Sequence, residues 1–258
     1  LELGATSVHW NDQGVTLAIG NSYTVTLTPF YQTFSEHDYA RFRREYGVNH
    51  AATAHWAVDD YTKPGMEAAG ARSARWYPAS IEAFEHQKRL VFRIAMPPEA
   101  STRLGCPALF TLELATLNRL GSSNSLEIVL QWFEKAASRL PEALWFKIAI
   151  EGASSTGWQL CKMDRWIDPL GVVRHGNRHL HGVEALRYHG TAGTLQVDTL
   201  DAALVAPGEP ALLSFPDDQP DPSTGAHFNL YNNVWGTNFP MWYDEDARFR
   251  FVIGVAVE

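Results

Sequence analysis

The sequence has no long hydrophobic run, few cysteines and no cluster of basic residues. No stretch approaches the roughly 18 consecutive apolar residues that a membrane-spanning helix needs. Its two cysteines, Cys106 and Cys161, cannot make a disulfide framework, and each lies beside apolar residues, so we expect both to be buried free thiols. The basic run at 41–45 is short and the net charge is −8, which disfavours nucleic-acid and anionic membrane partners.

Recognisable catalytic signatures are also missing. The chain contains no G-x-S-x-G, no P-loop, no G-x-G-x-x-G and no H-E-x-x-H. Its acidic residues include no pair whose context indicates a general acid opposite a nucleophile, as a glycosidase needs. The chain opens with LELGATSVHW, without Met or a signal peptide, so we expect it to be a piece of a longer polypeptide, and the compartment stays open.

What the sequence does contain indicates a mainly all-β protein. Aromatic residues make up 12% of the chain, and apolar residues alternate with polar ones in many short runs. Residues 5–28 resemble a β-hairpin with a turn at Asn21 and Ser22. The further predicted strands are 90–96, 108–117, 126–135, 143–152, 158–163, 180–190, 194–200, 211–215 and 247–257. Without intervening helices these strands predict two large antiparallel sheets packed face to face, in a single domain over residues 1–258.

One short helix is predicted near residues 36–46. Ser35 is the expected N-cap and Asp38 follows three residues later, while Gly47 ends the helix. Its Tyr39, Phe42 and Tyr46 recur at helical spacing, which predicts one packing stripe. The segment 47–80 has no clear periodicity, and its Asp59, Asp60 and Lys63 next to a Pro-Gly pair are typical of a solvated turn with a local ion pair.

The stretch 227–251 combines four asparagines with eight aromatic residues, and five of the aromatics (Phe228, Tyr231, Trp235, Phe239 and Trp242) are interspersed with the asparagines. Aromatic planes next to neutral hydrogen-bonding groups suit a sugar, which has apolar C–H faces and hydroxyl edges. The alternative interpretation is a turn whose asparagine side chains bind their own backbone and whose aromatics lie in the core.

Two further groups of residues could carry chemistry. In 132–146, four charged residues surround a Leu-Pro turn: Glu134, Lys135, Arg139 and Glu142. They could either bind a polar ligand at the rim of the sandwich or form a surface ion-pair network. In 174–184, His179 and His181 are two residues apart, so in a strand both would point to one face. A pair of histidines without a third ligand is weak support for zinc, and it can equally be structural.

Six segments spread in order over almost the whole chain carry a resemblance to a known family. They are YQTFSEHDYARF (31–42), DDYTKPG (59–65), WFEKAASRLPEALWF (132–146), DPLGVVRHGNRHLHGV (168–183), DAALVAPGEP (201–210) and HFNLYNNVWGTNFPMWYDEDARFRF (227–251). On these segments the chain resembles the C-terminal part of a family of large, uncharacterised glycoside-hydrolase-like proteins, a domain of unknown function related to the family 38 α-mannosidases.

The resemblance implies a large β-supersandwich of the galactose-mutarotase-like kind, placed after an α/β barrel. In family 38 enzymes the barrel carries the nucleophilic Asp and usually a divalent metal, often zinc. Because this chain contains no recognisable barrel, the resemblance assigns it no catalytic residue, metal or cofactor. It implies two partners, a carbohydrate substrate and the N-terminal catalytic domain of the same polypeptide, whose site the sandwich would complete.

The residues expected to contact the sugar form two groups. The first comes from the C-terminal stretch: Asn232, Asn233, Trp235, Asn238 and Trp242. The second comes from the two other constellations: Arg139, Glu142, His179 and His181.

Three alternatives remain. The chain could be a stand-alone carbohydrate-binding module, or a packing and oligomerisation domain. It could also catalyse a lyase or mutarotase reaction itself, which would require His179 or His181 within reach of Tyr231 or Arg178 in one cleft. The sugar and the linkage stay open, since a fold alone does not specify them.

Overall fold

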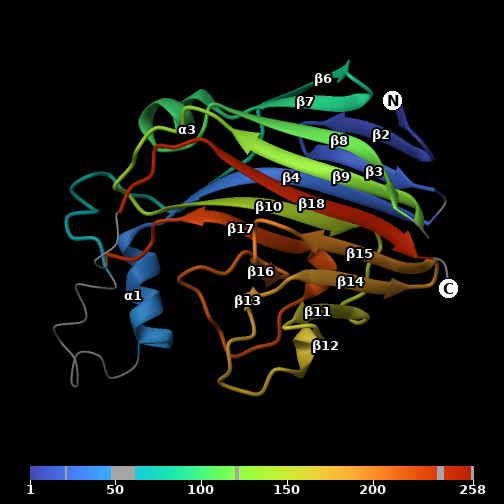
Figure 1. Cartoon of the computed structure of the whole chain (residues 1–258). Helices are drawn as coiled ribbons and strands as arrows, with labels where there is room; N and C mark the ends of the chain where they lie inside the picture. Colours follow the sequence, from blue (N-terminus) through green and yellow to red (C-terminus); the bar gives the residue numbers. More distant parts are fainter. Residues whose placement is uncertain (21, 48–61, 120–121, 237–240, 257–258) are drawn as a thin grey trace.

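The computed structural model of the chain describes residues 1–20, 22–47, 62–119, 122–236 and 241–256. Two antiparallel sheets of nine strands each pack face to face (Figure 1). The first has the order β1 (Glu2–Leu3), β2 (Thr6–Asn11), β3 (Gly14–Ile19), β4 (Tyr23–Thr33), β10 (Glu142–Ile150), β17 (Ala226–Asn232), β16 (Leu204–Pro207) and β13 (His181–Gly182), and β5 (Ala74–Trp76) also pairs with β4.

The second sheet has the order β12 (Arg165–Ile167), β11 (Trp158–Lys162), β14 (Ala185–Gly190), β15 (Gly193–Thr199), β18 (Ala247–Ala256), β9 (Ser122–Trp132), β8 (Leu109–Arg119), β7 (Arg89–Ala95) and β6 (Ser80–His86). Among the described residues, the helical elements are α1 (Glu36–Glu45), α3 (Pro98–Arg103) and the 3₁₀ turns η2 (Pro169–Gly171) and η3 (Pro222–Thr224). The predicted all-β sandwich is confirmed: strands account for 48% and helices for 10%, and α1 is the only helix of seven or more residues in the described part.

Most predicted strands are present, but the stretch 5–28 contains parts of three strands, β2, β3 and β4, rather than a two-stranded hairpin, and Asn21 of its predicted turn lies outside the described residues. Two further predictions differ from the structure. Residues 211–215 form no strand; Leu212 and Leu213 are buried in a loop that packs near α1. A short apolar run looks the same in a buried loop as in a strand, so alternation could not distinguish them. The predicted strand 180–190 is two strands, because β13 joins the first sheet and β14 the second.

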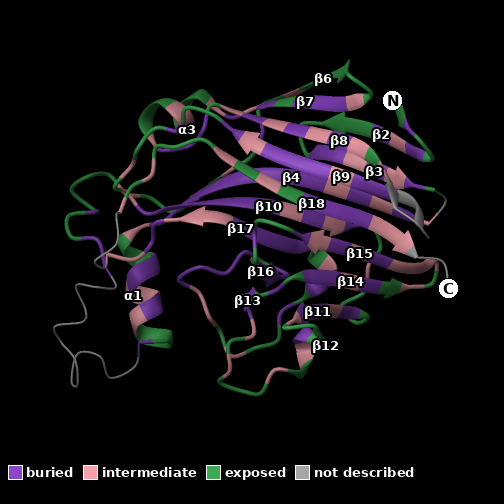
Figure 2. Cartoon of the chain, viewed as in Figure 1, coloured by how far each residue is buried: buried purple, intermediate pink, exposed green. Residues whose placement is uncertain are grey.

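The interior of the sandwich is filled by side chains from both sheets. Figure 2 shows buried residues along the strands of both sheets. The ring of Phe251 on β18 packs against the rings of Phe146 on β10 and Phe228 on β17. The distance between ring centroids is 5.1 Å in both pairs. All three rings are fully buried. Since β18 belongs to the second sheet and the other two strands to the first, this aromatic group joins the two layers.

Helix α1 packs a second, smaller core against the first sheet. The carboxylate of Asp38 accepts hydrogen bonds from the backbone N–H and the hydroxyl of Ser35, at 2.7 and 2.9 Å, which confirms the predicted N-cap. Tyr39 and Phe42 are buried as the stripe predicts, but Tyr46 is 60% exposed. The helix ends at Glu45, so Tyr46 lies beyond its last turn, where the helical spacing no longer fixes its direction.

Both cysteines are buried and free, as predicted. Among the described residues, no helix is both long and apolar enough to cross a membrane. Helices α1 and α3 lie at one end of the sandwich, and the two chain termini lie at the other (Figure 1).

We expect Phe251→Ala to lower the free energy of unfolding by about 3–5 kcal/mol, because it opens a cavity between the two sheets. Phe84, on the edge strand β6, is 45% exposed and supplies the control. Phe84→Ala should cost less than about 1 kcal/mol in the same urea titration. Equal losses in the two variants would contradict this account of the core.

Candidate functional site

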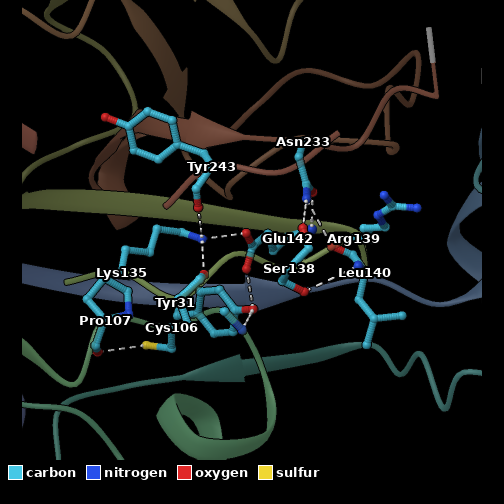
Figure 3. A network of polar contacts seen from close by, with 12 residues as sticks. Tyr31, Cys106, Pro107, Lys135, Ser138, Arg139, Leu140, Glu142, Asn233 and Tyr243 are labelled. Carbon is cyan, nitrogen blue, oxygen red and sulfur yellow. Dashed lines mark hydrogen bonds and ion pairs between the residues drawn. The ribbon is translucent and has the colours of Figure 1, made fainter. Parts of the chain in front are cut away.

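A buried ion pair lies where β9 leads into β10, at the helical end of the sandwich. The Lys135 ammonium is 2.7 Å from a carboxylate oxygen of Glu142, and neither side chain is exposed to solvent. The ammonium also donates to the backbone carbonyls of Ala136 and Tyr243, each at 3.1 Å (Figure 3). Its three hydrogens are therefore all used within the protein.

The other carboxylate oxygen of Glu142 accepts a hydrogen bond of 2.6 Å from the hydroxyl of Tyr31, on β4. That hydroxyl accepts the backbone N–H of Gly105 at 3.1 Å, and a Cβ at position 105 would collide with the carboxylate. Burial raises the pKa of Glu142, while Lys135 and Tyr31 oppose that rise. Glu142 was predicted at the rim as a ligand-binding or surface charge, and the surface interpretation is wrong for it.

Asn233 lies just beyond β17 and joins the two loops at this end. Its amide nitrogen donates to the carbonyls of Ser138, Leu140 and Met241, at 3.0, 3.1 and 2.9 Å. Its amide oxygen accepts the backbone N–H of Glu142 at 2.8 Å (Figure 3). Two N–H hydrogens shared by three acceptors are saturated, so Asn233 serves the protein rather than offering donors to a sugar.

Lys63 completes this group from a distant part of the sequence. It is buried, and its ammonium donates to the carbonyls of Arg139 at 3.0 Å and Met241 at 3.3 Å. Burial lowers its pKa to about 8. The expectation of a solvated turn is therefore wrong for Lys63, and Asp59 and Asp60 lie outside the described residues.

These buried groups hold two loops, 133–141 and 233–236 with 241–246, which together form what we call the loop end. Trp242 is 42% exposed here, and the guanidinium of Arg139 lies 4.4 Å from the centre of its indole ring. Phe133, at the start of the first loop, is 51% exposed. The loop end therefore presents an indole face and a cation, and buried side chains hold the backbone of its loops by hydrogen bonds.

The remaining residues of the Asn-rich stretch have different surroundings. Asn232 is half-buried and donates to the side-chain oxygen of Asn229 at 2.8 Å. Trp235 is half-buried and packs edge-to-face against Phe42 of α1, with ring centroids 5.2 Å apart. Asn238 lies outside the described residues.

His179 and His181 do not converge on one point, and neither lies with the loop-end residues. Nε2 of His179 is 3.0 Å from the carbonyl of Asp218, whereas Nε2 of His181 is 3.0 Å from the carbonyl of Arg178. Burial lowers the pKa of His181. Within the described ranges, no three His, Cys, Asp or Glu residues are grouped so that they could hold a metal ion.

Of the pairs that catalysis by this domain itself would require in one cleft, one shares a cavity. His179 and Arg178 line one cavity, but neither His181 nor Tyr231 belongs to its lining. Tyr231 instead packs against Lys135, whose ammonium lies 5.0 Å from the centre of the Tyr231 ring. Burial raises the pKa of the Tyr231 hydroxyl.

Sequence reasoning missed Tyr31, Gly105 and Lys63 as parts of this site. Tyr31 lies in strand β4, where its sequence pattern predicts only a core residue. Gly105 follows the short helix α3 and belongs to no recognisable sequence motif. Each reaches Glu142 or the loop backbone only through tertiary structure, so no local pattern could have identified them.

Comparison with known proteins adds a partial family match. Residues 6–120 match the model of a family described as a domain of unknown function, DUF5054. The match runs from β2 to β8 and covers less than half of the chain. The description of the family gives no activity. No curated protein matches the chain.

We expect Lys135→Met to lower the free energy of unfolding by about 3–5 kcal/mol, because it leaves the Glu142 carboxylate buried without its cation. The loss should shrink as the pH falls, because a protonated Glu142 needs no cation. The double variant Lys135→Met/Glu142→Gln should recover part of it. Chemical unfolding at pH 5 and pH 8 measures all three.

An exposed ion pair of the same length supplies the control. The Arg75 guanidinium is 2.7 Å from the Glu209 carboxylate, with side chains 38% and 69% exposed. Arg75→Met should cost less than about 1 kcal/mol. A loss in Lys135→Met no larger than in Arg75→Met would refute the importance of the buried pair.

Lys63 predicts a pH dependence on the alkaline side. Its pKa falls from 10.5 to about 8 on folding, so between those values the unfolded state binds more protons and stability rises with pH. The free energy of unfolding of the wild type, relative to Lys63→Met, should therefore increase from pH 8 to pH 10. A difference between the two proteins that does not change with pH would contradict the lowered pKa.

Proposed function

We propose that this chain is the β-sandwich domain of a glycoside-hydrolase-like protein, and that its loop end completes the carbohydrate site of an upstream catalytic domain. The observation that carries the proposal is the exposed Trp242, with Arg139 over its ring, on loops held by buried polar groups. Carbohydrate sites combine an aromatic face with hydrogen-bonding groups in this way.

The rigidity of the loop end supports binding. Loops that must be ordered on binding lose affinity, because the conformational entropy is removed at that moment. Here Lys63, Lys135 and Asn233 already fix the backbone carbonyls of Arg139, Tyr243 and Met241. The indole and the guanidinium can therefore meet a sugar with little rearrangement of their backbone.

The resemblance to the family 38 α-mannosidases supports the reaction class, hydrolysis of an O-glycosyl bond. In that arrangement the nucleophilic Asp and a divalent metal, often zinc, belong to the barrel and would supply the bond cleavage. The residues of this chain would contribute binding and orientation of the sugar. Arg139 could donate to hydroxyl oxygens, and Trp242 could stack on a C–H face.

Trp242→Ala in the longer polypeptide tests this role. We expect kcat/KM for aryl α- or β-glycosides to fall about tenfold, the effect of losing roughly 1.4 kcal/mol of binding to the transition state. Trp235→Ala is a poorer test, because Trp235 is half-buried against Phe42 and its loss would disturb packing. Phe84→Ala, an exposed aromatic on β6, is the matched control and should leave kcat/KM unchanged.

The 258-residue chain is assayed beside the longer polypeptide with the same glycosides. Activity only in the longer polypeptide, reduced by Trp242→Ala, supports a site-completing domain. Unchanged turnover in Trp242→Ala would reject the role of the loop end. Hydrolysis by the isolated chain would overturn the proposal and place the catalytic residues within this sandwich.

A further inference from the structure

A separate cavity lies beyond the C-terminal end of α1, away from the residues of the loop end. Its volume is about 480 Å³, within the usual range of roughly 300–1,000 Å³ for small-molecule sites. It is walled by the end of α1, by the loop 175–179 and by the loop 215–217. None of the loop-end residues belongs to this lining.

One wall of the cavity is aromatic. The rings of Tyr46 and Phe215 both line it, with centroids 5.3 Å apart. Phe42 supports Tyr46 from behind in a stacked arrangement at 5.4 Å. Tyr46 is 60% exposed, so a large ring stays open at the cavity while the buried Phe42 and the half-buried Phe215 pack against it.

Another part of the lining carries polar groups whose direction is fixed by hydrogen bonds. The amide oxygen of Asn177 accepts the backbone N–H groups of His179 and Leu180, at 3.2 and 3.1 Å. Its amide nitrogen donates to no group within the described part of the chain, although it belongs to a residue of the cavity wall. Arg178 is held through Nε on the carbonyl of Val172 at 3.0 Å and through Nη1 on the carbonyl of Asp217.

The charges of the cavity balance. Asp217 is paired with Arg174, whose Nε lies 2.7 Å from its carboxylate. Glu45 and Arg178, of opposite charge, both line the same cavity. A lining with both signs present has no strong preference for an anion or a cation, which is compatible with a neutral ligand.

We propose that this cavity binds a neutral sugar, with the pyranose ring stacked on Tyr46 and its hydroxyls bonded to Asn177 and Glu45. An aromatic face, fixed donors and free acceptors match the C–H face and the hydroxyl edge of such a ring. His179 closes the cavity as a wall, since its Nε2 bonds the carbonyl of Asp218. The site needs no upstream domain and is independent of the role of Trp242.

The test is titration of the purified 258-residue chain, followed by NMR shifts and calorimetry. The probes are the neutral methyl glycosides of D-mannose, D-glucose and D-galactose, with sodium D-glucuronate as the anionic comparison. We expect at least one neutral glycoside to bind and to bind more tightly than glucuronate. Failure of all three neutral glycosides to bind, or a preference for glucuronate, overturns the proposal.

Four variants locate the binding. Tyr46→Ala and Asn177→Asp should each weaken it at least about tenfold, since the second keeps the oxygen that accepts backbone N–H groups but removes the two donors. Tyr77→Ala, which removes an exposed ring outside the cavity, should leave the affinity unchanged. Trp242→Ala reports instead whether a glycoside binds at the loop end, which is a different site. Affinity lost in Trp242→Ala but kept in Tyr46→Ala would reject the cavity.

Discussion

The loop end depends on one buried ion pair. Moving an ammonium and a carboxylate out of water costs several kcal/mol per ion, and their attraction offsets this only when further hydrogen bonds satisfy the remaining groups. Lys135 and Glu142 meet that condition, because the ammonium has two carbonyl acceptors besides the carboxylate and the second carboxylate oxygen has the Tyr31 hydroxyl. Each of these added bonds attaches another segment of the chain to the pair.

An apolar pair of the same volume would fill this space at lower cost, but it could not orient backbone carbonyls. The ammonium fixes the carbonyl of Tyr243, one residue after the exposed Trp242. Lys63 and Asn233 fix the carbonyls of Arg139 and Met241 on the two sides of the same loop end. The buried polar groups therefore set the position of the indole and the guanidinium. An apolar core would make no hydrogen bonds to these loops and would not fix their backbone.

The sequence predicted the sandwich well, because alternation with period two directly reflects which face of a strand is buried. It also predicted α1 from Ser35 and Asp38, because helix capping depends only on residues that are close together in the sequence. It could not separate buried loop from strand at 211–215, and it could not assign one of two sheets to β13 and β14. Sheet membership depends on pairing between residues distant in the chain, about which local periodicity carries no information.

The predicted site residues show the same difference between what local patterns and what tertiary structure determine. The segments 132–146 and 227–251 were chosen separately, and the structure brings Arg139, Glu142, Asn233 and Trp242 to one end of the sandwich. The spacing of His179 and His181 predicted a shared face, but the two imidazoles bond different loops. Only β13, of two residues, has strand geometry there, so the alternation rule did not apply to His179.

Asn233 and Asn177 show how the same side chain can serve structure in one place and be available to a ligand in another. Both amide oxygens accept backbone N–H groups, which fixes the plane of each side chain. The nitrogen of Asn233 is then saturated by three carbonyls, whereas that of Asn177 has no acceptor within the described residues. A fixed direction with an unused donor is what a preorganised binding group requires. Residue type and sequence position cannot distinguish the two cases, because the difference lies entirely in the carbonyls that the fold brings to Asn233.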